Sequence, residues 1–145
     1  RTRQYYRALG YAKDYVWARH DDVPFTRPRK PLADCRLALI TTAGPAGHQG
    51  RRKLWSGAID PPPATLHTAN LSWDKESTHT DDRESFLPIE AASTLAREGL
   101  FAGLAPRFHG VPTDYSQRST TEDVAPEVLQ RLREDEVDGA ILCPL

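Results

Sequence analysis

Two short apolar runs, which lie far apart in the sequence, most strongly constrain the fold of this chain. The first run is CRLALITTAG at residues 35–44, and the second is VDGAILC at residues 137–143. A continuous apolar stretch that does not alternate with polar residues is typical of a strand buried on both faces of a parallel sheet. We therefore expect both runs to form central strands of one sheet.

Helices are predicted where apolar side chains recur at every third or fourth position. Three segments show this pattern: residues 1–16, 88–99 and 121–135. In the second of these, Pro88 suits the first helical position and Gly99 suits the C-terminal cap. In the first, Gly10 weakens the middle of the helix.

Strands that alternate with helices predict the α/β class. We expect a single domain over residues 1–145, with a mostly parallel sheet flanked by helices. The final strand is followed by only two residues, so we expect the sheet to be incomplete at its C-terminus. Residues 45–86 lack periodicity and include three consecutive prolines, which predicts an irregular loop or lid and the mobile part of the fold.

Charge and composition exclude several classes of protein. The 145 residues carry 19 Lys and Arg against 20 Asp and Glu, a net charge of -1. This near-neutrality argues against a general nucleic-acid or membrane-surface binder, and no apolar run is long enough to span a bilayer. The two cysteines, Cys35 and Cys143, match neither a disulfide framework nor a zinc site. We expect a cytoplasmic protein that binds neither nucleic acid nor membranes.

Two polar motifs contain candidate functional side chains. The first is RFHG at 107–110, which lies in a turn-rich stretch and follows a short candidate strand at 100–105. We therefore expect Arg107 and His109 at the carboxyl end of that strand, where ligands bind in α/β sheets. Arg107 suits a substrate carboxylate, or else pairs with an acidic residue. HTDD at 79–82 sets an imidazole beside carboxylates, the composition of a general base, a metal site or a solvated turn.

We expect the candidate residues to converge on one edge of the sheet, because side chains just beyond the ends of parallel strands gather there. Thr41 and Thr42 end the strand predicted in the first apolar run, so their hydroxyls would face the same edge. The predicted set is Thr41, Thr42, His79, Asp81, Arg107 and His109.

Two further features leave more than one interpretation open. The segment GPAGHQGRRK at 44–53 follows a strand, as phosphate-binding loops do. It matches neither the P-loop nor the dinucleotide-binding pattern, so two interpretations stay open, a flexible loop and an anion-binding site. Cys143 has no CxxC partner, which favours a buried structural thiol over a nucleophile.

Several segments, in order along the chain, resemble one family of enzymes. They are RTRQYYRALGY at 1–11, RPRKPLADCRLALITTAG at 27–44, STHTDDRESFLPIEA at 77–91, EGLFAGLAPRFHGVPTDYSQRST at 98–120 and APEVLQRLREDEVDGAILCPL at 125–145. The sequence is similar to the selenoprotein B family of glycine, sarcosine, betaine and D-proline reductases. LAPRFHGVPT and VDGAILCPL are the most specific pieces of this resemblance.

The resemblance implies thiol- or selenol-dependent reductive cleavage of a small amino acid or N-methylated derivative, with partner subunits of a reductase. In the family, a strand like residues 137–143 is followed by a redox-active Cys or selenocysteine and then by a second Cys. We therefore expect a chain truncated before this motif, with the selenocysteine or Cys just beyond Leu145, no cofactor within the chain, and no activity of the fragment alone.

The resemblance and the motifs together suggest roles for the candidate residues. His79, Asp81 and His109 are the predicted catalytic set, and Thr41, Thr42 and Arg107 are the predicted substrate-binding set. Two alternatives stay open. One is a non-catalytic subunit that binds a small carboxylate or a partner protein, and the other is a metal-dependent hydrolase that uses His79, Asp81 and His109.

Overall fold

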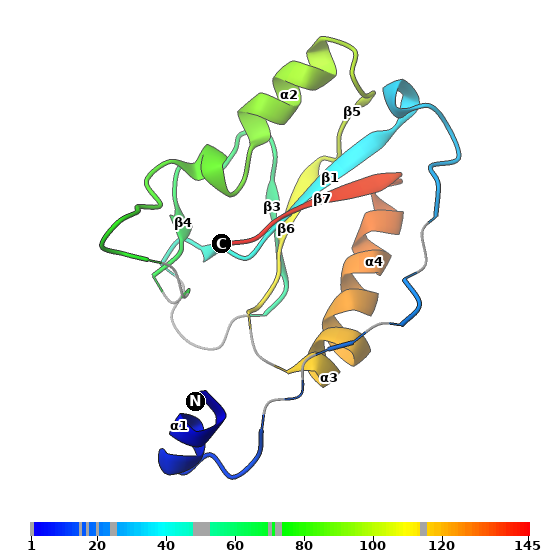
Figure 1. The fold of residues 1–145 in the computed structure, drawn as a ribbon. Coiled ribbons are helices and arrows are strands. Elements are labelled where there is room, and N and C mark those ends of the chain that lie inside the picture. Colours follow the sequence, from blue (N-terminus) through cyan, green and yellow to red (C-terminus); the bar gives the residue numbers. More distant parts are fainter. Residues whose placement is uncertain are drawn as a thin grey trace.

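A computed structural model describes most of the chain. The described residues are 2–14, 16, 18–19, 21–23, 26–47, 53–69, 71, 74–113 and 116–145. They form a sheet with a helix on each face and a separate short helix near the N-terminus (Figure 1). The predicted α/β fold with a mostly parallel sheet is confirmed.

Strand β1 (Arg36–Thr41) lies at the centre of the sheet and has three parallel neighbours. β7 (Gly139–Cys143) pairs along almost all of β1, from Leu37 to Thr41. β5 (Gly103–Leu104) pairs with the start of β1 and β6 (Arg107–Gly110) with its end. Because a strand has only two edges, β5 and β6 share the edge opposite β7.

The remaining strands are short. β3 (Trp55–Ala58) pairs antiparallel with β6 and extends the main sheet. β2 (Gly44–Pro45) and β4 (Leu66–His67) form a separate two-stranded antiparallel sheet beyond the end of β1. Two single 3-10 turns, η1 (Leu32–Asp34) and η2 (Arg83–Ser85), precede β1 and α2.

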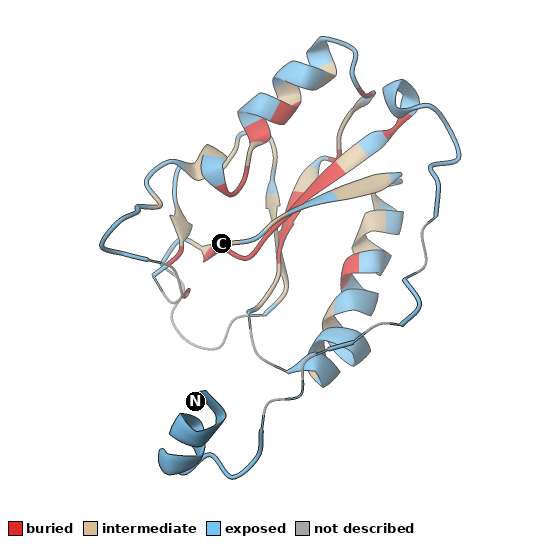
Figure 2. Ribbon diagram, viewed as in Figure 1, coloured by how far each residue is buried: buried red, intermediate tan, exposed pale blue. Residues whose placement is uncertain are grey.

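The hydrophobic core lies between the sheet and helix α2 (Ile89–Arg97), which covers one face (Figure 2). Phe108 is fully buried there, and its ring meets the Trp55 ring edge-to-face at a centroid distance of 5.2 Å, a favourable aromatic geometry. Leu39 of β1 and Ile89 of α2 belong to the same cluster. The helix predicted over 88–99 is confirmed, with Pro88 as its N-cap and Gly99 in the left-handed conformation after its end.

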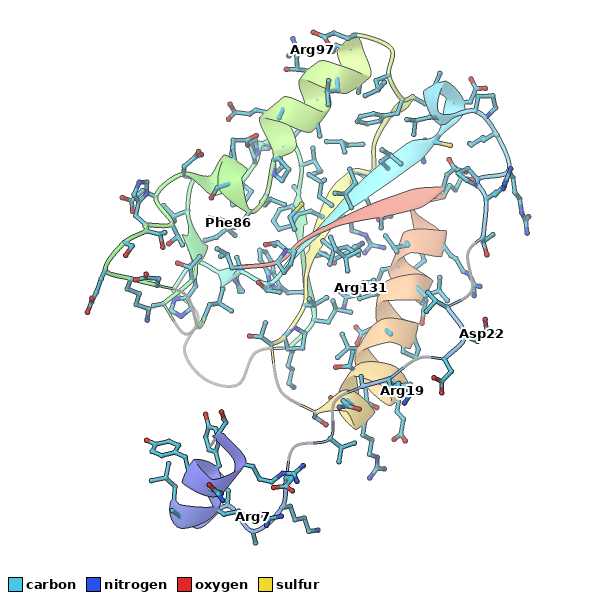
Figure 3. The ribbon with its side chains drawn as sticks, in the orientation of Figure 1. Arg7, Arg19, Asp22, Phe86, Arg97 and Arg131 are labelled. Carbon is cyan, nitrogen blue, oxygen red and sulfur yellow. The ribbon has the colours of Figure 1, made fainter. Side chains whose placement is uncertain are left out.

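The opposite face is covered by a nearly continuous helical segment: α3 (Gln117–Ser119), η3 (Thr120–Val124) and α4 (Ala125–Glu134). The helix predicted over 121–135 is thereby confirmed. Val128 is its one buried residue among those described. The contact of α4 with the sheet is therefore partly polar, and Figure 3 shows Arg131 on the side of α4 that faces the strands.

The two apolar runs of the sequence have different environments. The first run forms β1, and residues 38–41 are buried as predicted. The prediction that the second run is a buried strand is wrong, because β7 lies at the edge of the described sheet. Ile141 is 41% exposed and Leu142 is 70% exposed. None of the five residues of β7 is in the buried class.

The RFHG motif also differs from its prediction. It is not the loop after a strand but strand β6 itself, inserted between β1 and β3. Phe108 and His109 alternate to opposite faces and both are fully buried, which explains why this polar sequence forms an inner strand. Residues 45–86 contain β3, β4 and η2, and the idea that this segment acts as a lid stays a prediction.

Helix α1 (Thr2–Ala8) is shorter than the helix predicted over residues 1–16. Gly10 follows it with a φ of 89°, a left-handed conformation that ends the helix. Tyr5 and Leu9, part of the predicted apolar stripe, are more than half exposed. None of the helices among the described residues is both long enough and apolar enough to cross a membrane.

The first prediction concerns Gly110, the last residue of β6. A Cβ at this position would lie 2.5 Å from Cε2 of Trp55, whose indole N–H donates to the carbonyl oxygen of Ala43. We expect Gly110→Ala to lower the free energy of unfolding by about 3 kcal/mol, because the partly buried Trp55 ring must move. Urea denaturation measures this change.

Gly139→Ala is the matched control for this prediction. Its added Cβ meets only the flexible end of Leu37, at 3.2 Å, so we expect a change below about 1 kcal/mol. Equal losses in the two variants would contradict the packing of Trp55 against Gly110.

Candidate functional site

The carboxyl ends of three parallel strands meet at one edge of the sheet. In the register of the strands, Thr41 of β1 is paired with Gly110 of β6 on one side and with Cys143 of β7 on the other. Ligands of open α/β sheets bind outside this edge of the strands. We call it the carboxyl edge, defined by Thr41, Thr42, Gly110 and Cys143.

The two threonines at the carboxyl edge are buried and hydrogen-bonded to the backbone. Thr41 Oγ1 accepts from the backbone N–H of Ala43 at 3.3 Å, and Thr42 Oγ1 accepts from the N–H of Leu145 at 2.9 Å. Thr41 is 1% exposed and Thr42 is 9% exposed. These hydroxyls therefore fix the chain that leaves β1 and the chain that leaves β7 beside each other.

The HTDD motif is attached to the same end of the sheet. Gly44, just beyond β1, pairs with His67 of β4, and the next hydroxyl, Thr68 Oγ1, lies 2.6 Å from Thr80 Oγ1. The neighbouring side chains of His79 and Asp81 are exposed, with Nδ1 and Oδ2 3.7 Å apart. This imidazole and carboxylate are free to meet a ligand from solution.

Arg107 does not join this group, contrary to prediction. It begins β6, whereas Gly110 at the carboxyl edge ends the same strand. Its Nε donates to Asp135 at 2.7 Å and its Nη2 to Glu134 at 2.8 Å, at the C-terminus of α4. Hydrogen bonds to Asp135 and then to Glu134 raise the pKa of the Arg107 guanidinium. The second interpretation of Arg107, as the partner of an acidic residue, is the one the structure shows.

His109 is fully buried on the face of the sheet that α4 covers. Its Nδ1 lies 2.9 Å from Ser56 Oγ, and Nη1 of Arg131 donates to the same oxygen at 2.7 Å. Ser56 Oγ accepts from Arg131 and also shares a hydrogen bond with Nδ1 of His109, whose direction is set by the tautomer of the imidazole. Burial, followed by the charge of Arg107, lowers the pKa of His109.

The Ser56–His109–Arg131 contact could not be found by local motifs. These residues come from β3, β6 and α4, and no sequence spacing links them. The Nε2 atom of His109 is buried without a hydrogen-bond partner in the described part of the chain. The sequence contains part of the signal for this contact. Adjacent residues of a strand face opposite sides, so a His next to a core Phe faces the side away from that core.

The structure also separates the residues of the proposed metal site. His79 and Asp81 are exposed in a segment with no regular secondary structure, whereas His109 is buried under α4 and hydrogen-bonded to Ser56. Among the described residues, no group of three or more His, Cys, Asp or Glu side chains could hold a metal ion. Within the glycine-rich loop at 44–53, residues 48–52 lie outside the described ones, and so does most of its anion-site prediction.

Comparison with known proteins identifies two relatives of the chain. The glycine reductase complex component B subunit gamma of Symbiobacterium thermophilum is 26% identical over 144 residues, which cover 91% of this chain and 33% of that protein. The D-proline reductase subunit gamma of Acetoanaerobium sticklandii is 31% identical over 136 residues, which cover 83% of this chain and 55% of that protein. No family model and no solved structure match the chain.

These similarities show a distant relation to subunits of reductase complexes. The chain spans about a third of the length of one relative and about half of the other. The predicted resemblance to glycine and D-proline reductases is confirmed at this level.

A second prediction follows from the buried imidazole. The pKa of His109 is lowered in the folded state relative to its ordinary value of 6.5. As the pH falls through about 6.5, the unfolded chain takes up a proton that the folded state resists, so the free energy of unfolding decreases. We expect this decrease to become smaller in His109→Asn, measured by denaturation between about pH 7.5 and 5.

His79→Asn is the control, because this imidazole is exposed and makes no contact with the core. It should keep the pH dependence of the parent chain. An unchanged slope in His109→Asn would show that His109 is not held neutral by burial.

A third prediction concerns the thiol at the end of β7. Burial raises the pKa of Cys143, so the unreactive thiol predominates at neutral pH. We expect the folded protein to react with iodoacetamide several times more slowly at pH 7 than free cysteine does, and faster as the pH rises. Cys143→Ser should abolish the labelling, because the remaining Cys35 is 2% exposed and donates to the Pro31 carbonyl. Labelling of Cys143 faster than free cysteine at pH 7 would overturn this.

Proposed function

We propose that this chain is part of a selenoprotein B-like subunit of a reductase complex that cleaves a small amino acid or N-methylated derivative. The proposal rests on the similarity of the chain to two reductase subunits, one named for glycine and one for D-proline. The two alignments cover 91% and 83% of this chain. In such a cleavage the C–N bond breaks, a C–H bond forms at the same carbon, and the amine leaves with a proton. The two electrons and the two protons come from a thiol pair that is oxidised to a disulfide.

The position of β7 supports this proposal. The strand ends at Cys143 beside Thr41, and the following segment is held at the carboxyl edge by the hydrogen bond from Leu145 N–H to Thr42. In the proposed enzyme, the redox-active Cys or selenocysteine that the resemblance implies after this strand stands at that edge. A selenol is ionised at neutral pH and needs no dedicated base.

The candidate residues take two kinds of role in this proposal. Thr41 and Thr42 shape the carboxyl edge, while His79, oriented by Asp81, exchanges the proton of the leaving amine. Arg107 and His109 act at a distance from the substrate, because their contacts fix α4 against the sheet.

A second candidate function is a non-catalytic subunit that binds a small carboxylate or a partner protein. The state of Cys143 favours it, since burial raises the pKa of this thiol and removes the nucleophile from the carboxyl edge of the described chain. When its ligand is a small carboxylate, the second function uses the same edge as the first. They differ in whether electrons are transferred there.

The fourth prediction tests the binding shared by both functions. We expect glycine, sarcosine, betaine or D-proline to shift backbone NMR signals of Thr41, Thr42 and His79 in a saturable way. A His79→Ala, Asp81→Ala double variant should weaken binding at least tenfold, which corresponds to about 1.4 kcal/mol. Glu76 is exposed in the turn that precedes His79. Glu76→Ala is therefore the control and should bind as the parent chain does. The absence of any shift at the carboxyl edge would remove the proposed site.

The same samples test whether the redox pair lies within residues 1–145 when a dithiol is added. The chain alone should release no amine, because its Cys143 has no second thiol at the carboxyl edge in the described residues. Robust dithiol-driven cleavage by the purified chain would contradict the proposal that the redox pair lies outside residues 1–145.

A further inference from the structure

We call the first 30 residues of the chain the arm and the rest the body. Helix α1, in the arm, lies away from the sheet (Figure 1). Further along the arm, Gln117 Nε2 donates to the carbonyl oxygen of Val16 at 2.6 Å, and Lys30 forms an ion pair with Asp138 at 2.7 Å. The ion pairs of this helix stay within the arm, because both Arg3 and Arg7 bind Asp14. No residue of α1 is buried (Figure 2).

The arm exposes an unusual share of apolar surface. Half of the twelve large apolar side chains that are exposed in the described residues belong to it: Tyr5, Tyr6, Leu9, Tyr11, Val16 and Val23. The three tyrosines form one cluster, with edge-to-face contacts at centroid distances of 5.7 Å and 5.8 Å. Clustered tyrosines are a characteristic of protein interfaces, because they bury a large area at a small cost in side-chain entropy.

Helix α1 is also too short to be stable without a partner. It has seven residues, and isolated helices below about 12–15 residues are marginal in water, since the cost of nucleation is not recovered. The stability of such a helix comes from packing of one of its faces. An exposed seven-residue helix that carries a tyrosine cluster therefore needs a surface to dock on.

Charge identifies the kind of surface. The arm carries eight Lys and Arg residues against three Asp, a net charge of five positive. The body carries eleven Lys and Arg against seventeen Asp and Glu, a net charge of six negative. The two parts of each chain are thus of nearly equal and opposite charge, which steers a basic arm toward an acidic body.

We propose that the arm docks on the body of a second copy of this chain, and that two chains exchange arms around a twofold axis. A nucleic acid or anionic membrane fits less well, since the acidic body would be repelled from it. This proposal is independent of the proposed function and goes beyond it.

The fifth prediction is a dimer that depends on the arm. Sedimentation equilibrium of the full chain should show a concentration-dependent dimer that weakens as salt is raised from about 0.05 to 0.5 M, because screening removes the attraction between arm and body. Replacing all three tyrosines by serine (Tyr5→Ser, Tyr6→Ser, Tyr11→Ser) should weaken association at least tenfold. Val23→Ser, which removes an exposed apolar side chain outside the tyrosine cluster, should leave association within twofold of the parent chain.

Unfolding by urea, measured at a protein concentration low enough to keep the full chain monomeric, should be the same in all three proteins, so a change in association reflects the arm. A chain that is monomeric at every concentration and salt would overturn the proposal, including the case in which the arm binds its own body or an unrelated partner. A dimer that persists unchanged in the triple variant would overturn it as well.

Discussion

The parallel pairing of β1 with β7 is the interaction on which the rest of the structure depends. It joins residues 37–41 to 139–143 in continuous register and closes almost the whole length of the chain into one domain. Asp138, just before β7, accepts from the backbone N–H of Arg36, and Thr42, just after β1, accepts from Leu145. Both ends of the pair are therefore held by side chains as well as by the ladder, and the carboxyl edge is a consequence of this register.

The two faces of the sheet are stabilised in different ways. The face under α2 is apolar and packs Phe108 against Trp55, whereas the face under α4 holds the contacts of Arg107, His109 and Arg131. Polar contacts beneath a helix require defined geometry, since an unmatched buried group costs more than a matched one contributes. The position of α4 is thus specified by particular partners, and that of α2 by shape and burial.

The sequence predicts what local patterns determine. Strand β1, helix α2 with Pro88 and Gly99, and helix α4 all follow from apolar spacing and capping residues. Strand β6 does not, because the burial of His109 depends on Ser56 and Arg131 from distant segments. The same reason explains Arg107, whose carboxylate partners lie 27 and 28 positions away in sequence. Of the predicted site, Thr41 and Thr42 lie at the carboxyl edge as expected, and the roles assigned to His79 and Asp81 stay predictions.

The exposure of β7 shows the limit of reading burial from composition. The apolar sequence of this strand resembles that of β1, yet β1 has neighbours on both sides, whereas β7 pairs only with β1 among the described strands. Net charge has a similar limit. A value of -1 for the whole chain suggests mixed charges, but it is the sum of a basic arm and an acidic body. An argument from average charge excludes a charged partner only where the charges are evenly distributed, because association depends on the local field of the surface that makes contact.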